Sequence, residues 1–239
     1  MSLPIIILAG GLGTRLGNLT LSSPKALIEI NGQPFIRHQI SYLKTQGLKQ
    51  VVVSIGHMGA KIQSALGDGE KFGLNISYSE DGKKLLGTGG AVAKAASAID
   101  CENFFVTYGD SFLPIDFQKM FRYFQSSQKI YNLMTVFRNC GQFDACNVKL
   151  GKNKTMLYDK KSPSKEMDHI DYGLSIINKK MFLEFANSDV FDLADFYHAM
   201  SIKNLMTPYI VTERFYEIGS IQGIEDTTKF FRRRRGKAD

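Results

Sequence analysis

The chain has 239 residues, of which 44% are hydrophobic and 11% aromatic, and its formal net charge at pH 7 is +7. This length is sufficient for one large α/β domain with a sizeable core. Its apolar runs are shorter than the roughly 20 residues that a membrane-spanning helix requires. The apolar start is too short for a signal peptide and leads directly into glycines. We therefore expect a cytoplasmic protein without a membrane partner.

Much of the positive charge lies at the C-terminus. Residues 232–239 carry +4 of the total charge of +7. Nucleic-acid-binding proteins usually interleave basic and aromatic residues on one face, whereas a terminal basic run is more often a solvated end. We expect no nucleic-acid partner, and we predict a single domain over residues 1–231 followed by a disordered basic tail over 232–239.

The first strong pattern is an apolar strand followed by a glycine-rich turn. Residues 5–8 read Ile-Ile-Ile-Leu, an unbroken apolar run typical of a strand that is covered on both faces of a mostly parallel sheet. Gly10, Gly11 and Gly13 follow directly. Glycines let the backbone approach a ligand and turn its N–H groups toward it. The turn is therefore suited to an anion, and phosphate is the first choice.

Two familiar glycine motifs do not fit this turn. A kinase-type P-loop requires Gly-Lys followed by Ser or Thr, and the sequence contains no such tripeptide. The dinucleotide fingerprint GxGxxG would begin at Gly11, but its third glycine position is occupied by Leu16. A Rossmann oxidoreductase remains an alternative that binding of a reduced cofactor would support.

Beyond the turn, apolar strands alternate with amphipathic helices. This alternation is the signature of right-handed βαβ units on a parallel sheet, whose ligands bind at the carboxyl ends of the strands. We predict an α/β fold, a Rossmann-like three-layer α/β/α sandwich with a mostly parallel mixed central sheet. In this first half, the predicted strands are 5–8, 51–55, 74–78 and 104–108, and the predicted helices begin at Pro34, Met58 and Ala91.

Shorter strands are predicted in the second half. Gly151-Lys152-Asn153 reads as a hairpin turn between two of them. We see no linker or repeat before the arginine run. The predicted strands are 131–136, 145–150, 155–159, 169–177, 209–211 and 215–218, and the predicted helices are 179–185 and 192–200.

Several of these segments together resemble one known family, the sugar-1-phosphate nucleotidyltransferases. The resemblance covers residues 3 to about 231 and implies a GT-A-like variant of the predicted fold. It also implies an enzyme of the EC 2.7.7 type that joins a nucleoside triphosphate and a sugar 1-phosphate to give an NDP-sugar and pyrophosphate. The matching segments are Leu8-Ala9-Gly10-Gly11-Leu12-Gly13-Thr14-Arg15-Leu16, Pro24-Lys25-Ala26-Leu27 and Gly32-Gln33-Pro34.

The resemblance and the chemistry of polyphosphates assign three catalytic residues. Arg15 is expected to grip the β- and γ-phosphates through its guanidinium, and Lys25 to place a charge near the α-phosphate. Asp110, which follows Gly109 at the end of a buried strand, is expected to hold Mg²⁺. The attacking sugar phosphate is already ionised, so no catalytic base is required.

Further nucleotide contacts are expected along the same strand ends. Glu80 is a candidate for bonding the base or ribose, although an exposed strand-end acid is an equal reading of it. The full nucleotide-binding set is Leu8, Ala9, Gly10, Gly11, Gly13, Thr14, Arg15, Lys25, Glu80, Gly87, Thr88 and Gly89.

The second metal carboxylate and the acceptor site depart from the family pattern. Glu217 lies in Glu-Ile-Gly-Ser, where the family usually has Asp-Ile-Gly-Thr, and its longer side chain would change the metal position or affinity. Lys161, with Lys160 as its rival, is expected to meet the sugar phosphate. Asp171 stands where the family usually has Asn and would accept bonds from sugar hydroxyls. The sugar-phosphate set is Gly90, Lys161, Asp171 and Gly173.

The form Gly87-Thr88-Gly89-Gly90 resembles the guanylyl members of the family. The best match is to enzymes acting on heptose 1-phosphate and, more loosely, mannose 1-phosphate, which supply precursors of surface polysaccharide or lipopolysaccharide. Cytidylyl, uridylyl or thymidylyl transfer is an alternative. A non-catalytic nucleotide-binding regulatory domain is another, because Glu217 and Asp171 depart from the pattern. A homo-oligomer is an open option.

Overall fold

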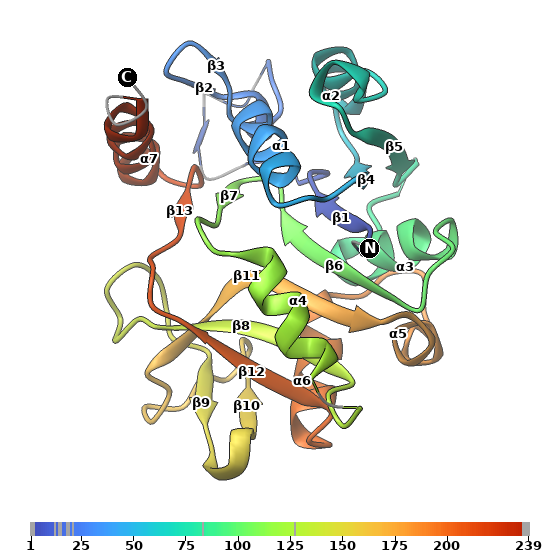
Figure 1. Cartoon of the computed structure of the whole chain (residues 1–239), viewed down its shortest axis with the longest axis vertical. Helices are drawn as coiled ribbons and strands as arrows, with labels where there is room; N and C mark the ends of the chain where they lie inside the picture. The colour runs from blue at the N-terminus through green and yellow to red at the C-terminus, as the bar shows by residue number, and fades with distance from the viewer. Residues whose placement is uncertain are drawn as a thin grey trace.

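The computed structural model describes residues 3–11, 13, 16–17, 20, 22–82, 84–126 and 128–235. Within them, a central nine-stranded sheet runs in the order β10-β9-β11-β6-β1-β4-β5, while β8 pairs with β11 and β12 pairs with β8 (Figure 1). The strands are β1 (Ile5–Leu8), β4 (Gln50–Ile55), β5 (Asn75–Glu80), β6 (Asn103–Tyr108), β8 (Asn132–Arg138), β9 (Val148–Leu150), β10 (Met156–Tyr158), β11 (His169–Asn178) and β12 (Met206–Val211).

Helices cover both faces of this sheet. The described helices are α1 (Phe35–Thr45), α2 (Gly59–Leu66), α3 (Gly87–Ser97), α4 (Phe117–Gln125), α5 (Lys179–Phe185), α6 (Leu193–Ile202) and α7 (Ile221–Arg235), with short 3₁₀ turns η2 (Lys25–Leu27), η3 (Glu70–Phe72) and η4 (Lys152–Lys154). Two small ribbons pair β2 (Glu29–Ile30) with β3 (Gln33–Pro34), and β7 (Ser111–Phe112) with β13 (Tyr216–Glu217).

The alternation of side chains along β1 explains the three layers. Ile5 and Ile7 belong to the core on the face covered by α1, α2 and α4. Ile6 belongs to the core on the opposite face, which α3, α5 and α6 cover. All three isoleucines are fully buried, because successive strand residues point to opposite faces. The predicted α/β/α sandwich is confirmed.

The first four strands of the central sheet, β1, β4, β5 and β6, are parallel, and they bring the functional segments to one edge. β1 pairs in parallel with both β4 and β6, with Leu8 opposite Ser54 on one side and Tyr108 on the other. β5 continues the parallel sheet beyond β4. The residues that follow these strands therefore meet at a common edge of the sheet.

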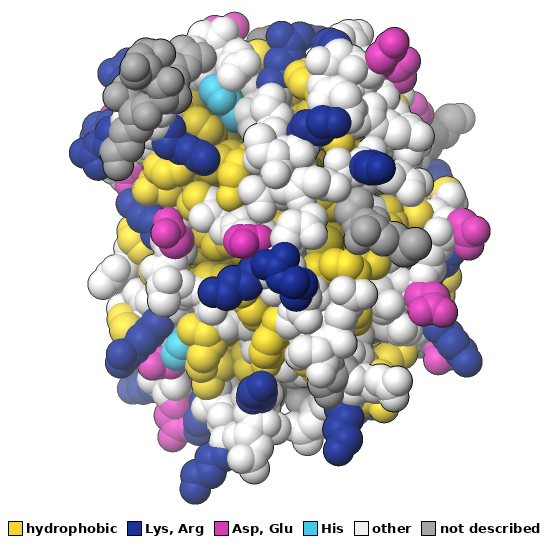
Figure 2. Space-filling view, viewed as in Figure 1, with side chains coloured by type: hydrophobic (Ala, Val, Ile, Leu, Met, Phe, Trp, Pro, Cys, Tyr) yellow, Lys and Arg dark blue, Asp and Glu magenta, His cyan; other side chains and the backbone are white. Residues whose placement is uncertain are grey.

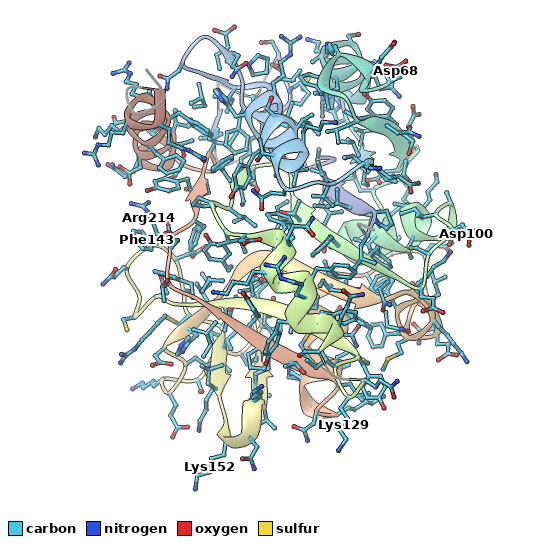
Figure 3. All side chains as sticks on the ribbon, viewed as in Figure 1. Asp68, Asp100, Lys129, Phe143, Lys152 and Arg214 are labelled. Carbon is cyan, nitrogen blue, oxygen red and sulfur yellow. The ribbon has the colours of Figure 1, made fainter. Side chains whose placement is uncertain are left out.

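The second half of the sheet is largely antiparallel. β11 runs antiparallel to β6 and β8, and its pairing with β8 is irregular between Asp171 and Ser175. Gly173 lies inside this bulge with a φ of 101°, a conformation that favours glycine. The predicted hairpin joins β9 and β10, and Lys152 lies at its outer end (Figure 3).

Some predicted boundaries are wrong. α3 begins at Gly87 rather than Ala91, so the second glycine cluster forms its first turn. Pro34 belongs to β3 and precedes α1. β9 begins at Val148 rather than Ala145, and β12 begins at Met206 rather than Tyr209.

The C-terminal helix α7 was not predicted. It extends to Arg235, so residues 232–235 are helical rather than the start of a disordered tail; residues 236–239 lie outside the described part of the chain. Ser220 caps the helix by accepting a hydrogen bond from the Gly223 N–H. Basic side chains gather over α7 at the upper left of Figure 2. Among the described residues, no helix is both long and apolar enough to cross a membrane.

Candidate active site

A cavity of about 390 Å³ opens at the carboxyl ends of β1, β4 and β6 and beside the first turn of α3. This size suits a small-molecule ligand. Its wall contains the glycine turn after β1 together with Asp110 after β6, as the strand order predicts. The lining residues are Leu8, Ala9, Gly10, Gly11, Gly13, Lys25, Ala26, Ser54, Asp81, Leu85, Gly87, Thr88, Ala91, Tyr108, Gly109 and Asp110.

Gly109 allows the two strand ends to approach closely. Its N–H donates to the Leu8 carbonyl at 2.8 Å, and a Cβ at this position would lie 2.9 Å from the Ala9 Cβ. Any larger residue would push the Asp110 turn away from the glycine turn. Gly13 has a φ of 65°, as expected for a turn that exposes backbone N–H groups. The predicted contacts Thr14 and Arg15 lie outside the described residues.

Lys25 and Asp110 form an ion pair on the cavity wall. The Lys25 Nζ donates to the Asp110 Oδ2 at 2.8 Å, and the two side chains are 15% and 35% exposed. Lys25 begins η2 directly after Pro24, which explains how a lysine from a loop is held against the end of β6. Two of the three predicted catalytic residues are therefore in contact.

Glu217 does not line the cavity, but the β7–β13 ribbon brings its backbone next to Asp110. Glu217 pairs with Ser111, and the Ile218 N–H donates to the Asp110 carbonyl at 3.0 Å. A Cβ on Gly219 would lie 3.0 Å from the Lys25 Nζ and closer still to the Glu217 Oε2, so both side chains reach Gly219. The Glu217 carboxylate also accepts bonds from the Gly219 N–H and, at 2.8 Å, from the Ser220 hydroxyl.

The carboxylates of Asp110 and Glu217 are suitable ligands for a magnesium ion that binds together with phosphate. The described residues contain no group of three or more His, Cys, Asp or Glu side chains that could hold a metal ion. Mg²⁺ needs fewer, because it keeps several waters and takes one or two carboxylates in addition to phosphate oxygens. Asp110 and Glu217, which neighbouring strands bring together, supply ligands of this kind. Their role as metal ligands remains a prediction.

The cavity wall also contains an acid that sequence reasoning missed. Asp81 lines the cavity, and its Oδ2 lies 3.4 Å from where a Cβ on Gly10 would be. Burial raises the pKa of Asp81, while Lys94 and the Leu86 N–H oppose that shift. Glu80 instead points to the exterior and accepts a bond from Gln63 at 3.0 Å. The signal for Asp81 was the same strand-end position that drew attention to Glu80.

In the second glycine cluster, residues 87–90, the first two residues line the cavity and the last two pack against another segment. Gly87 and Thr88 line the cavity, and the Thr88 hydroxyl also donates to the Asp192 carboxylate at 2.8 Å. Gly89 and Gly90 do not line it. They are buried, and a Cβ on either would collide with the segment 189–191. These two glycines are therefore explained by the packing of α3, rather than by the predicted contacts with nucleotide and sugar phosphate.

Asp171 lies next to the cavity, at the bulge of β11. Its Oδ1 accepts a bond from the Gly173 N–H at 2.9 Å, and burial raises its pKa to about 6. The pKa of Tyr108, a cavity-lining residue, is raised well above its usual value by burial and then by the charge of Asp171. Neither Asp171 nor Gly173 lines the cavity, but a Cβ on Gly173 would lie 3.5 Å from the ring of Tyr108, so the β11 bulge lies behind a cavity-lining residue.

The two candidate lysines for the sugar phosphate differ in their surroundings. Lys161 is exposed and forms an ion pair with Asp195. The charge of Lys160 lowers the pKa of Asp171, and the charges of both lysines lower the pKa of Asp192. Both lysines stay candidates for the sugar phosphate.

Comparisons with known proteins agree with this geometry. Residues 5–141 match the family model described as nucleotidyl transferase. The chain is 29% identical to D-glycero-alpha-D-manno-heptose 1-phosphate guanylyltransferase of Campylobacter jejuni, over 90% of this chain and 93% of the relative. It is 37% identical to N-acetylmuramate alpha-1-phosphate uridylyltransferase of Neisseria meningitidis, over 49% and 51% of the two chains.

The fold also matches a solved structure. HddC from Yersinia pseudotuberculosis complexed with GMP-PN superposes with a TM-score of 0.77 and 21% sequence identity, covering 96% of this chain and 100% of that one. The family match spans the glycine turn, Lys25 and Asp110, which are the residues that the cavity brings together. The chain belongs to the nucleotidyl transferase family.

Proposed function

We propose that this protein is a sugar-1-phosphate nucleotidyltransferase that uses GTP, with heptose 1-phosphate as the first choice of acceptor and mannose 1-phosphate as the second. The observation that carries the proposal is the single cavity that unites the glycine turn after β1 with the Lys25–Asp110 pair after β6. The nucleotide sugars made from these sugar 1-phosphates would be precursors of surface polysaccharide. The reaction would take place in the cytoplasm.

The cavity residues suit polyphosphate binding. Backbone N–H groups of the glycine turn would hold phosphate oxygens, and the Lys25 ammonium would offset the charge that develops around the α-phosphorus. Arg15 retains its predicted role at the β- and γ-phosphates. A bound Mg²⁺, held by Asp110 and Glu217, would neutralise phosphate charge and stabilise the leaving pyrophosphate.

The reaction needs no proton transfer by the protein. A phosphate oxygen of the sugar 1-phosphate forms a bond to the α-phosphorus, and the bond between that phosphorus and the oxygen bridging to the β-phosphate breaks. Pyrophosphate departs with the bonding electrons. The protein must therefore hold the two phosphate groups in line and compensate their charge, which is a task for cations and oriented backbone donors.

Asp81 supports guanine as the base. Guanine presents two adjacent donors, N1–H and the 2-amino group, to which a carboxylate can bond with both oxygens. Uracil presents a single N3–H donor in the corresponding place. Asp81 is the acid that lines the cavity near Gly10, on the side of β4 and β5. The heptose 1-phosphate guanylyltransferase that aligns over 90% of this chain supports the same base.

Asp171 supports an acceptor rich in hydroxyl groups. A carboxylate accepts hydrogen bonds and donates none when ionised, and one of its oxygens is already bonded to the Gly173 N–H. The other can accept from a sugar hydroxyl. Lys160 or Lys161 would then meet the sugar phosphate.

The test is pyrophosphate release, detected as phosphate through a coupled pyrophosphatase. Four nucleoside triphosphates are crossed with heptose, mannose, glucose and N-acetylmuramate 1-phosphates. The proposal expects the highest kcat/KM with GTP and heptose or mannose 1-phosphate, and near-complete loss in Asp110→Asn. The proposal would be contradicted if the Asp110→Asn variant released pyrophosphate at the parent's rate with every combination of nucleotide and sugar 1-phosphate. Tight nucleotide binding without pyrophosphate release would instead support a regulatory domain.

A further inference from the structure

Gln39 lies on α1, outside the cavity, yet it binds the backbone on both sides of Asp110. Its side-chain Nε2 donates to the Tyr108 carbonyl and to the Ser111 carbonyl, each at 2.9 Å. Carbonyl oxygens only accept hydrogen bonds, so this atom must be the amide nitrogen. Gln39 is 4% exposed, and its contacts are therefore shielded from water.

The Asp110 carboxylate itself is bonded by Lys25 and by the Ser111 hydroxyl, while the backbone of the turn is also held by main-chain hydrogen bonds. The Gly109 N–H donates to the Leu8 carbonyl at 2.8 Å, and the Asp110 carbonyl accepts from the Ile218 N–H at 3.0 Å. Together with the two bonds from Gln39, they fix the turn between β6 and β7. Gln39 supplies the side-chain part of this arrangement, which a substitution can remove without touching the strands.

The other end of the Gln39 amide indicates that the two donor bonds are needed. Its Oε1 is buried and has no hydrogen-bond partner among the described residues. Burying an acceptor without a donor is unfavourable, and an apolar side chain of similar size would fill the space without that cost. If Gln39 only filled space, its buried Oε1 would make it less stable there than an apolar side chain. Its two N–H groups instead bond to the two carbonyls that flank Asp110.

We propose that Gln39 is a positioning residue that sets the place of the Asp110 carboxylate, and through it the affinity of the site for a divalent cation. The inference rests on the proposed function only in assigning a cation to Asp110. Residues behind metal ligands orient them, and their loss commonly weakens metal binding by 10- to 100-fold. Gln39 would act in this way through the backbone of its ligand.

The experiment measures Mn²⁺ binding to the folded protein by electron paramagnetic resonance of the free ion, with GTP present and no acceptor, and a protein-free titration subtracts the Mn²⁺ that GTP binds by itself. Gln39→Met keeps the length of the side chain and removes both donor bonds. The control is Gln46→Met at the end of the same helix, which removes a 3.0 Å bond from the Phe117 N–H, a group outside the turn that carries Asp110. We expect about a tenfold higher Kd for Mn²⁺ in Gln39→Met, and the parent's Kd in Gln46→Met.

A double variant separates positioning from general loosening of the fold. If Gln39 acts through Asp110, adding Gln39→Met to Asp110→Asn should weaken Mn²⁺ binding no further than Asp110→Asn alone. If Gln39→Met does not fold, the Kd for Mn²⁺ is measured in Gln39→Asn instead, with the same expected increase, because the shorter amide cannot reach both carbonyls. Melting temperatures confirm that each variant is folded.

The outcomes distinguish this inference from the proposed function. A parent Kd retained by a folded Gln39→Met or Gln39→Asn protein would overturn the positioning role while leaving the proposed function in place. Equal weakening in Gln46→Met would overturn it as well, because the effect would then be one of stability. Absence of Mn²⁺ binding in the parent with GTP would overturn both.

Discussion

The Lys25 Nζ lies 2.8 Å from the Asp110 Oδ2, although 85 residues separate them in the chain. The pair joins the loop after the glycine turn to the end of β6, and the Gly109 N–H bond to the Leu8 carbonyl holds the two strand ends together. Lys25, the proposed phosphate-binding cation, and Asp110, the proposed metal-binding carboxylate, thus occupy one wall of one cavity. Their contact has consequences that mutagenesis can test.

Removing the charge of Lys25 should impair turnover without unfolding the protein. Lys25→Met keeps the length of the side chain, and we expect kcat/KM for pyrophosphate release to fall at least about 100-fold because the α-phosphate loses its cation. Lys180→Met is the matched control, since Lys180 is 84% exposed and pairs with Glu184 on the surface. A Lys25→Met enzyme as active as the control would contradict the assigned role.

Asp81 should decide the preference for guanine. Inosine triphosphate lacks the 2-amino group, so we expect the parent to favour GTP over it and Asp81→Asn to reduce that preference about tenfold, the loss typical of one charged hydrogen bond. The ratio of kcat/KM values for the two nucleotides measures this directly. Glu80→Gln serves as the neighbouring control. If only Glu80→Gln reduced the preference for GTP, the base contact would belong to Glu80 and not to Asp81.

Glu217 should affect metal binding more than stability. Glu217→Gln keeps one oxygen that can accept from the Gly219 N–H, and its amide NH2 can donate to the Ser220 hydroxyl oxygen, so the start of α7 should remain intact. The lost charge should weaken Mn²⁺ binding about tenfold in the presence of GTP. Calorimetry for the metal and thermal unfolding for the fold separate the two effects. A large drop in melting temperature with unchanged metal affinity would identify Glu217 as structural.

Asp171 should make stability depend on pH. Its pKa is raised by burial from 3.8 to about 6 in the folded protein, so between these values the folded state binds more protons than the unfolded state. The free energy of unfolding therefore falls as pH rises through this window. Relative to the parent, Asp171→Asn should gain about 1–3 kcal/mol between pH 4 and pH 7. Urea unfolding at both pH values measures the difference, and a constant gap would show that Asp171 is not perturbed.

The sequence predicted the sheet and the shared edge because both depend on local patterns. The run Ile5 to Leu8 identifies a doubly covered strand, and the glycines and Asp110 follow strand ends directly. Parallel pairing then places them together. Lys25 was added by resemblance, and its contact with Asp110 could not be read from spacing.

Features that depend on tertiary contacts were missed. No helix is predicted from the sequence over residues 221–231, where the ring of the buried Phe231 stacks on His38 at 4.2 Å, a contact with a distant part of the chain. Which of Glu80 and Asp81 faces the cavity is fixed by the way the chain leaves β5, since adjacent residues point to opposite sides. Gly89 and Gly90 are small because residues 189–191 pass beside α3.

The most direct test of the central claim is a crystal structure with a non-hydrolysable GTP analogue and Mg²⁺. We predict that the phosphates lie against the glycine turn and Lys25, that Asp110 binds the metal ion, and that the guanine lies beside Asp81. A nucleotide bound elsewhere, or one whose phosphates face away from Asp110, would contradict the account.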